Sequence, residues 1–460
     1  MSETTNPGVS MRGRRTSRSG IAWSLVLATF AMSAMTASVS SSSQQRDRAS
    51  VPVTPEFFGM HIHNVVVRSD QGTVTRWPSV AFGSWRLMDA YVKWRDLEPA
   101  KGQWNFRTLD QSVLLAEQNG VDLVFTLGLT PRWASARPDE PTYTYGPGVA
   151  AEPRDIGDWE NYVARVVGRY KGRIKYYEIW NEPWFSEIEK TIRSDGKAGF
   201  YSGSAAKMVE MAGVAYRVIK GIDPGAKVIA PSMDHANEGI KRLDLYLSLG
   251  GKAFTDIVGF HLYAPTPEST LPIIAGIRTV LARHGMSNTE IWNTESGYVI
   301  ENPGEQTGSG GERVLSGQDA AGFVARSLLL AASSGISRFY WYAWDNRIRG
   351  LTSGRNKEIN SAGVAFGTVR RWMLGAIVEN CRSSSTFQWE CDVKRGQRVA
   401  RVAWNTAGAS TMWRIPSQWS VMEYETLDGQ VMQKGAERVV PLGASPVLFK
   451  SDNLPWPTAR

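Results

Sequence analysis

Apolar and polar positions follow two periodicities along most of the chain. Short runs rich in β-branched and aromatic residues predict buried strands, and the segments between them repeat apolar residues at the spacing of an amphipathic helix. The predicted strands are residues 57–63, 84–87, 122–127, 174–180, 227–230, 257–263, 290–295 and 338–344. The predicted helices are residues 107–119, 158–170, 205–222, 272–284, 316–334 and 362–374. Strands that alternate with helices form parallel sheets, and eight such units close a barrel. The pattern therefore predicts an α/β fold, a (β/α)8 TIM barrel.

The pattern changes beyond about residue 375. Short alternating segments with turn signals, such as Asp428-Gly429, predict a small C-terminal antiparallel β domain. Residues 51–57, just before the barrel, are expected to contribute to it. The sequence thus predicts a barrel over residues 51–376 and a β domain over residues 377–460.

Residues 1–50 form a third kind of segment. Four arginines precede an uncharged stretch whose apolar part spans residues 21–39, and a Ser-rich linker follows. A basic segment before an apolar one is the pattern of a signal peptide. A stretch of about 20 residues would also just span a bilayer core of about 30 Å. Because serines and threonines dilute the stretch, we expect a cleaved signal peptide, with a membrane anchor at residues 20–40 as the alternative. Either predicts an exported protein, periplasmic or extracellular, or else anchored in the inner membrane.

Charge and cysteine content narrow the classes of function. The formal net charge is +8, but six arginines against Glu3 and Asp47 place half of this excess in residues 1–50. The remainder has no cluster of basic residues with interleaved aromatics, so we expect no nucleic-acid partner. No cofactor motif appears, and none is predicted. The two cysteines, Cys381 and Cys391, could pair across a hairpin in an exported protein, with two unpaired thiols as the alternative.

Two predicted strands run out into a carboxylate. Asn181-Glu182 follows the strand of residues 174–180, and Pro183 stops the pairing there. Glu295 ends a later strand, where Gly297 opens the turn. Because the C-terminal ends of barrel strands meet at one mouth, both side chains are expected to lie together. Two carboxyl groups at one site suit glycoside cleavage, in which one gives a proton and the other attacks.

The surroundings of the two glutamates assign their roles. Glu182 lies between Trp180 and Trp184, and a desolvated carboxyl keeps its proton to higher pH. Glu295 is expected to stay ionised through hydrogen bonds and the charge of Arg86. The alternative for either residue alone is a structural carboxylate that caps a loop.

Several motifs also resemble a known group of enzymes. They are the Trp180-Asn181-Glu182-Pro183 box, Glu295 at a later strand end, His261-x-Tyr263, Trp344, and the segment from Trp94 through Glu98-Pro99 to Trp104. Together they resemble the clan A retaining glycoside hydrolases, most closely family 39 and the related bacterial exopolysaccharide-operon glycosidases. The resemblance covers residues 57–374.

The resemblance implies roles for individual residues. Glu182 would be the acid/base and Glu295 the nucleophile. Arg86 and Tyr263 would hold Glu295, and Asn181 would bind the sugar 2-hydroxyl. The residues implied to contact sugar directly are Trp344, at the floor of the subsite, and Trp133, His61 and His261. An oligosaccharide or polysaccharide would be the substrate, with internal cleavage of a bacterial extracellular or envelope polysaccharide favoured and β-xylosidase-like action from the chain end as the alternative. The structural alternatives are an ordinary ion pair for Arg86, core packing for the two tryptophans and a buried barrel histidine for His61.

Two other classes of function compete with this interpretation. In the first, His61, His63, His235, His261 and Asp345 would bind zinc, as in amidohydrolase barrels. That alternative leaves both strand-end glutamates unexplained, so no metal is predicted. In the second, the protein would bind polysaccharide during envelope assembly without cleaving it. The β domain itself is expected to be a structural module packed on the barrel, with a separate sugar-binding module as the alternative. A binding groove, however, does not need an acid and a nucleophile together.

Overall fold

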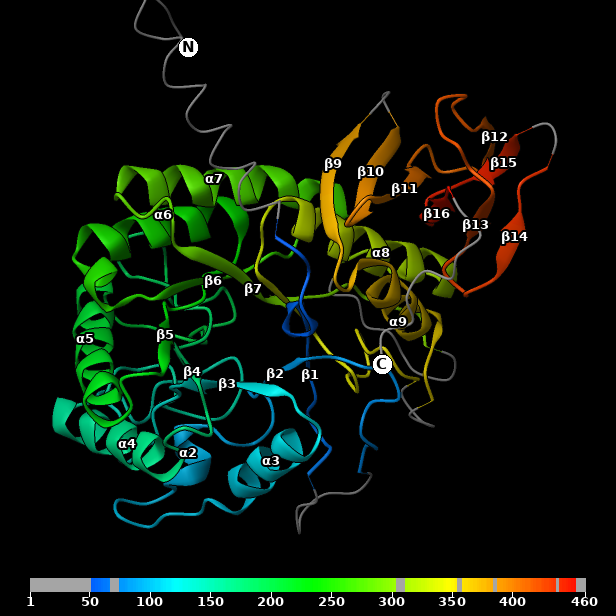
Figure 1. Ribbon diagram of the computed structural model, residues 1–460. Helices are drawn as coiled ribbons and strands as arrows, with labels where there is room; N and C mark the ends of the chain where they lie inside the picture. The colour runs from blue at the N-terminus through cyan, green and yellow to red at the C-terminus, as the bar shows by residue number, and fades with distance from the viewer. Residues whose placement is uncertain are drawn as a thin grey trace, which may run out of the picture. The chain divides into compact units, whose positions relative to one another are not determined.

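A closed barrel of eight parallel strands forms the centre of the protein (Figure 1). The computed structural model describes residues 51–66, 74–302, 311–353, 358–383, 387–435 and 438–451. In barrel order, the strands are β1 (Phe58–His61), β2 (Ser84–Arg86), β3 (Asp122–Leu127), β4 (Tyr176–Ile179), β5 (Lys227–Ile229), β6 (Ile257–His261), β7 (Glu290–Ser296) and β8 (Arg338–Trp341). The predicted TIM barrel is confirmed.

Helices cover the outside of the barrel after each strand from β2 onward (Figure 1), whereas the described residues between β1 and β2 contain none. They are α2 (Trp94–Leu97), α3 (Arg107–Gln118), α4 (Ile156–Arg169), α5 (Ala205–Ile222), α6 (Ala236–Ser248), α7 (Thr270–Arg283), α8 (Gly317–Ser333) and α9 (Ser361–Met373), with short 3-10 helices at Pro55–Phe57, Gly251–Phe254 and Pro267–Ser269. Several begin at side-chain caps, such as Ser204, whose hydroxyl accepts from the Lys207 amide. Helix α6 was not predicted, although Leu243, Tyr246 and Leu247 bury a stripe at helical spacing.

The C-terminal part is antiparallel, as predicted. Its strands are β9 (Ile377–Ser383), β10 (Gln388–Arg395), β11 (Arg398–Asn405), β12 (Thr411–Arg414), β13 (Glu423–Glu425), β14 (Val431–Gln433), β15 (Val439–Leu442) and β16 (Val447–Lys450). Six of them form one sheet in the order β14-β13-β16-β11-β10-β9, and β12 pairs with β15. The prediction for residues 51–57 was wrong: Val53 instead bridges Leu374, and the chain then enters the barrel.

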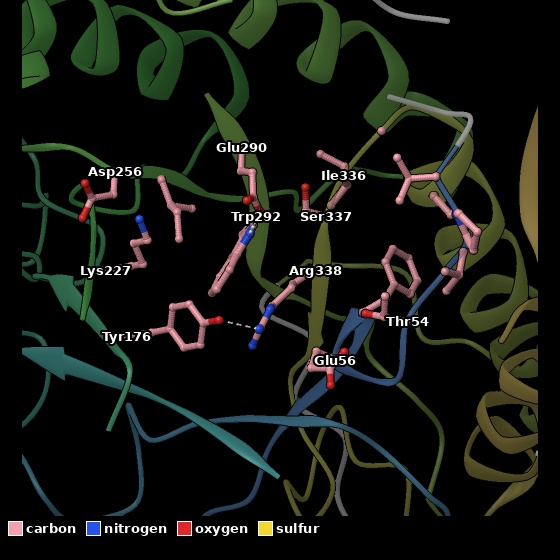
Figure 2. Close-up of a pocket in the computed structure, with 17 residues that line it drawn as sticks. Thr54, Glu56, Tyr176, Lys227, Asp256, Glu290, Trp292, Ile336, Ser337 and Arg338 are labelled. Atoms are coloured by element: carbon pink, nitrogen blue, oxygen red, sulfur yellow. Dashed lines mark hydrogen bonds between the residues drawn. The ribbon is translucent and has the colours of Figure 1, made fainter. Parts of the chain in front are cut away.

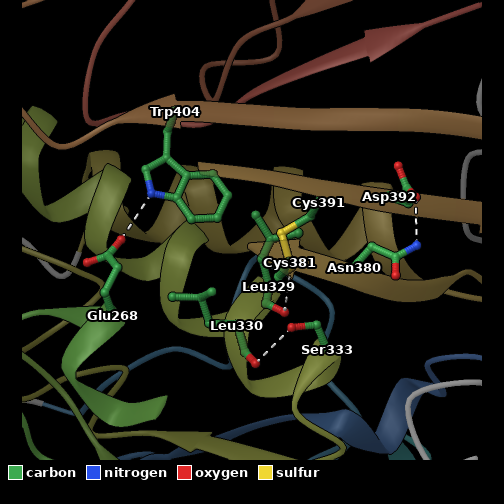
Figure 3. The surroundings of a disulfide bond; sticks show 9 residues. All are labelled: Glu268, Leu329, Leu330, Ser333, Asn380, Cys381, Cys391, Asp392 and Trp404. Atoms are coloured by element: carbon green, nitrogen blue, oxygen red, sulfur yellow. Dashed lines mark hydrogen bonds between the residues drawn. A yellow bond between two sulfur atoms is a disulfide. The ribbon is translucent and has the colours of Figure 1, made fainter. Parts of the chain in front are cut away.

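A disulfide between Cys381 and Cys391 joins β9 to β10 (Figure 3). The alternative of two unpaired thiols is therefore wrong. Beside it, the Trp404 indole donates to Glu268 in the barrel domain over 3.0 Å. These contacts show the β domain packed on the barrel, as expected of a structural module.

A cavity of about 570 Å³ lies at the N-terminal ends of the barrel strands, opposite to the ends that carry Glu182 and Glu295. Figure 2 shows the residues that line it. It is lined by the first residues of several strands, among them Tyr176, Lys227, Glu290 and Arg338. The Arg338 guanidinium lies 4.4 Å from the ring centroids of both Tyr176 and Trp292, and it donates to Asp122 over 2.9 Å. We attribute these contacts to the stability of the barrel, because the N-terminal face of a TIM barrel serves stability and the C-terminal face carries the chemistry.

The predicted signal peptide or anchor, residues 1–50, lies outside the described residues. Among the residues that are described, no helix has the length and apolar character needed to cross a membrane.

Candidate active site

Two residues in left-handed conformation carry Glu182 past the end of β4. After Ile179, Trp180 has a φ of 65° and Glu182 a φ of 43°. Such a conformation costs a non-glycine residue about 1–2 kcal/mol, so other contacts must hold it. The Glu182 amide donates to the Ser232 carbonyl over 3.0 Å, and the buried Trp180 indole donates to the Phe200 carbonyl over 2.8 Å. These bonds fix the backbone from which the Glu182 carboxyl extends.

Glu295 lies within β7, one residue before its end. Its Oε1 accepts a hydrogen bond from the Tyr263 hydroxyl over 2.9 Å, and its Oε2 accepts one from Arg86 Nη1 over 2.8 Å. Both donors were predicted to hold this carboxylate.

The structure brings the two glutamates together. One oxygen of Glu182, one of Glu295 and a nitrogen of His261 all lie within 4.8 Å of one another. His261 Nδ1 lies 2.7 Å from Glu182 Oε1 and 4.0 Å from Glu295 Oε1. The side chains therefore converge from β4, β6 and β7 on one point at the C-terminal mouth of the barrel.

Arg86 connects this pair to the barrel interior. Its fully buried guanidinium donates to Glu178 over 2.8 Å, to Glu295 over 2.8 Å and to Asn181 Oδ1 over 2.7 Å. Glu178 also accepts from the hydroxyls of Thr126 and Ser232. The sequence interpretation missed Glu178, although a charged residue inside a buried strand requires a partner.

Burial dominates the protonation of both glutamates. It raises the pKa of Glu182 to about 8, helped by Asp234 and opposed by the cations nearby. It also raises the pKa of Glu295 to about 7, against the influence of His261 and Arg86. The expectation that Arg86 holds Glu295 fully ionised is therefore corrected, because desolvation outweighs the ion pair. Burial thus raises the pKa of both carboxyl groups, with the larger rise at Glu182.

The two predicted histidines occupy different positions. His261 contacts Glu182 directly, and burial lowers its pKa. His61, at the end of β1, lies with Nε2 3.1 Å from the Thr294 carbonyl oxygen, and burial lowers its pKa well below the ordinary value. A neutral buried histidine matches the structural alternative for His61.

The two tryptophans that the resemblance implies at the site lie in different surroundings. The Trp133 indole donates to the Glu98 carbonyl over 2.9 Å and packs on Trp94, and none of its described contacts involves either carboxylate. Trp344 is only 3% exposed, and its amide donates to the His61 carbonyl over 2.8 Å. The strand was expected to continue to Trp344 but ends at Trp341, so Trp344 lies in a buried turn.

A half-buried tyrosine, Tyr342, was missed. Its ring lies 5.0 Å from that of His61, and its hydroxyl donates to Asp89 over 2.7 Å. Asp89 also contacts Tyr145 and Lys93. Burial would raise the pKa of Asp89, but Lys93 and these hydroxyls bring it far below its usual range.

The residues of the zinc alternative do not form one cluster. Asp345 accepts from the amides of His63 and Asn64, each over 2.8 Å, and His235 pairs with Asp234. Within the described ranges, the one group with metal-ligand spacing consists of Glu182, His261 and Glu295. That group is the carboxyl pair itself, and it does not contain the histidine set that the alternative requires.

Comparison with known proteins gives a family match over part of the barrel. Residues 84–249 match the family described as Glycosyl hydrolase family 10. Endo-1,4-beta-xylanase 3 of Hypocrea jecorina is 31% identical over 160 residues, which are 34% of this chain and 42% of that protein. Endo-1,4-beta-xylanase C of Phanerodontia chrysosporium is 25% identical over 212 residues, which are 44% of this chain and 48% of that protein. The chain thus spans less than half the length of these two relatives.

Solved structures extend the similarity to the whole fold. A family 39 glycoside hydrolase from Bacteroides cellulosilyticus WH2 has a TM-score of 0.63 at 18% identity, over 86% of this chain and 82% of that one. A monomeric beta-xylosidase from Caulobacter crescentus CB15 has a TM-score of 0.57 at 15% identity, over 88% and 97%. At these identities the likeness concerns the fold. These findings bear out the resemblance inferred from the motifs: part of the barrel matches glycosyl hydrolase family 10, and the fold is like that of a family 39 enzyme.

Proposed function

We propose that the protein is a retaining glycoside hydrolase that cleaves O-glycosidic bonds within a polysaccharide. The observation that carries this proposal is the approach of Glu182 and Glu295, because one carboxylate oxygen of each lies within 4.8 Å of the other. Retaining enzymes place their carboxyl groups about 5–5.5 Å apart, whereas inverting enzymes need about 6.5–9.5 Å for a water molecule.

The environment of each carboxyl fits one step of the double displacement. Glu182, with the higher pKa, gives its proton to the leaving oxygen while Glu295 attacks the anomeric carbon. Arg86 and Tyr263 orient Glu295 for this attack. In the second step Glu182, now ionised, takes a proton from water while the water oxygen attacks the anomeric carbon. The bond between the sugar and Glu295 breaks, and both carboxyl groups return to their starting states.

Asn181 is oriented for substrate by its own hydrogen bond. Because its Oδ1 accepts from Arg86, its amide NH2 group points the other way and is left to donate. We assign that donor to the sugar 2-hydroxyl, where a hydrogen bond gains strength as positive charge develops on the ring.

For the substrate we propose a β-1,4-linked xylan, cut internally. Both relatives described above are named endo-1,4-beta-xylanases, which supports this class. A bacterial extracellular polysaccharide is the next substrate to test. The likeness to a beta-xylosidase over 97% of its length favours a second candidate, removal of single sugars from the chain end.

We also propose that the protein is exported. The Cys381–Cys391 disulfide supports this, because such bonds persist in oxidising compartments. Labelling of intact cells with an impermeant reagent, followed by N-terminal sequencing of the mature protein, tests export and cleavage together.

The activity test uses purified protein with xylan, xylohexaose and aryl β-xylosides. Glu182→Gln and Glu295→Gln are each expected to lose at least about 10³-fold in turnover while remaining folded. Glu290→Gln is the matched control, because it removes a carboxylate from the far end of the same strand, β7. Proton NMR of the first product distinguishes retention from inversion, and the lengths of the xylohexaose products distinguish internal from terminal cleavage. Binding of xylan without turnover would instead support the polysaccharide-binding alternative.

A further inference from the structure

A fully buried arginine on α6, Arg242, holds the segment that carries Glu182. Its Nη1 donates to the Pro183 carbonyl over 2.7 Å and to Asp234 Oδ1 over 2.8 Å. Its Nη2 donates to the Asp234 carbonyl over 2.8 Å. Pro183 directly follows Glu182 in the chain, so the guanidinium is bonded to the backbone immediately beside the acid.

The contacts of Arg242 join segments that are separate in sequence. Asp234 lies beyond β5, while Pro183 and Glu189 lie beyond β4, and Arg242 Nε is 3.1 Å from Glu189 Oε1. A buried cation is tolerated only where such partners satisfy it. The segment it holds is strained, because Glu182 has a positive φ. Strain of this kind persists only when the surrounding structure enforces it.

We propose that Arg242, clamped to Asp234, is a positioning residue for Glu182 that fixes the acid against the leaving-group oxygen. This inference rests on the function proposed above. It adds a role for two residues that touch neither the substrate nor the reacting atoms.

The charged groups around Glu182 predict how its pKa should change in variants of Arg242 and Asp234. Asp234 raises the pKa of Glu182, while His235, Arg86 and Arg242 lower it. The other titratable groups that face it are Glu295, His261, Tyr145 and Tyr263. Loss of the Asp234 charge should therefore lower the pKa of the acid. Loss of the Arg242 charge should raise it, because Asp234 then acts without its partner.

The experiment compares Arg242→Met and Asp234→Asn with wild type on aryl β-xylobiosides of graded leaving-group ability. For Arg242→Met we expect kcat/KM to fall at least about tenfold with phenol as leaving group, since a misplaced catalytic group costs up to about 10²-fold. With 2,4-dinitrophenol, which needs no proton, the fall should stay below about threefold. The alkaline limb of kcat/KM should move to higher pH in Arg242→Met and to lower pH in Asp234→Asn.

Arg326→Met is the matched control. Arg326 is a buried arginine of α8 that pairs with Glu268 over 2.9 Å, remote from Glu182 in the chain. We expect this variant to lose stability without any change in leaving-group dependence or in the alkaline limb. If Arg242→Met does not fold, Asp234→Asn, which is nearly isosteric, still tests the shift to lower pH.

The outcomes separate the inference from the proposed function. Equal losses for all leaving groups, or shifts of the same sign in both variants, would overturn the role of Arg242. A Glu182→Gln variant that keeps wild-type activity on the phenyl substrate would instead overturn the assignment of the acid, whatever the two clamp variants do.

Discussion

Arg86 and Glu178 form an ion pair of 2.7 Å in which neither side chain is exposed. Glu178 partly neutralises the arginine that donates to Glu295 and Asn181. A buried arginine with the nucleophile as its sole carboxylate partner would hold that carboxylate more strongly. The ion pair thus weakens the effect by which Arg86 lowers the pKa of Glu295. Burial raises that pKa to about 7.

Glu178→Gln tests this relationship. The variant leaves Arg86 with less compensation, so the pKa of Glu295 should fall and the acid limb of kcat/KM should move to lower pH. Breaking a buried pair is also expected to destabilise the fold by about 3 kcal/mol. The pH profile and urea unfolding measure the two effects. An acid limb that stays in place while stability falls would show that Glu178 serves the fold alone.

The pH dependence of wild type follows from the two carboxyl groups. Below pH 7 Glu295 gains a proton and cannot attack, because its pKa is about 7. Above pH 8 Glu182 loses its proton and cannot assist the leaving group, because its pKa is about 8. We therefore expect a narrow bell-shaped kcat/KM profile with its maximum between these two pKa values. Because the two carboxyl groups interact, the apparent pKa values of the profile belong to the pair. A kcat/KM profile with a broad plateau from acidic to neutral pH would contradict the raised pKa of Glu295.

The disulfide should stabilise the β domain without affecting catalysis. It closes a loop of 10 residues between β9 and β10. The replacement of both cysteines, Cys381→Ser with Cys391→Ser, should lower the free energy of unfolding by about 2.7 kcal/mol, the value that the loop entropy gives. Urea unfolding of oxidised and reduced wild type provides the comparison. Turnover should be unchanged, and its loss would show that the β domain takes part in the site.

The two carboxylates could be predicted from sequence because local chemistry marks their strand ends. Pro183 ends pairing after Glu182, and Gly297 follows Glu295 by two residues. Glu178 carried a weaker signal, a charge inside a buried run, but its partner depends on which strands adjoin. Arg242 carried none, because its helix was not predicted and its bonds cross from one strand–helix unit to another.

The end of β8 shows where alternation fails. Tyr342 and Trp344 share one phase, so the pattern could not separate them. The strand ends at Trp341, after which the backbone no longer alternates. Tyr342 consequently stays half-buried beside His61, while Trp344 enters the core. Which of the two side chains is buried depends on the path of the turn after β8. The alternation within a strand does not predict that path.

Tyr263→Phe isolates one hydrogen bond to the nucleophile. The Tyr263 hydroxyl donates to Glu295 Oε1 over 2.9 Å, and this bond favours the ionised carboxylate. Without it the pKa of Glu295 should rise, so the acid limb of kcat/KM should move to higher pH. Hydrogen bonds to charged groups contribute about 1.5–3 kcal/mol, so we expect kcat/KM at neutral pH to fall between about 10-fold and 100-fold.

Tyr176→Phe is the control for the loss of a tyrosine hydroxyl. The Tyr176 hydroxyl accepts from Arg338 over 2.9 Å at the opposite end of the barrel. Its removal should cost stability alone and leave the pH profile unchanged. The shift in Tyr263→Phe is also opposite in sign to the shift expected for Glu178→Gln, although both variants act on the same carboxylate. Shifts of the acid limb in opposite directions would identify the electrostatic surroundings of Glu295 as the cause. General damage to the barrel would instead lower activity in both variants and leave the acid limb in place.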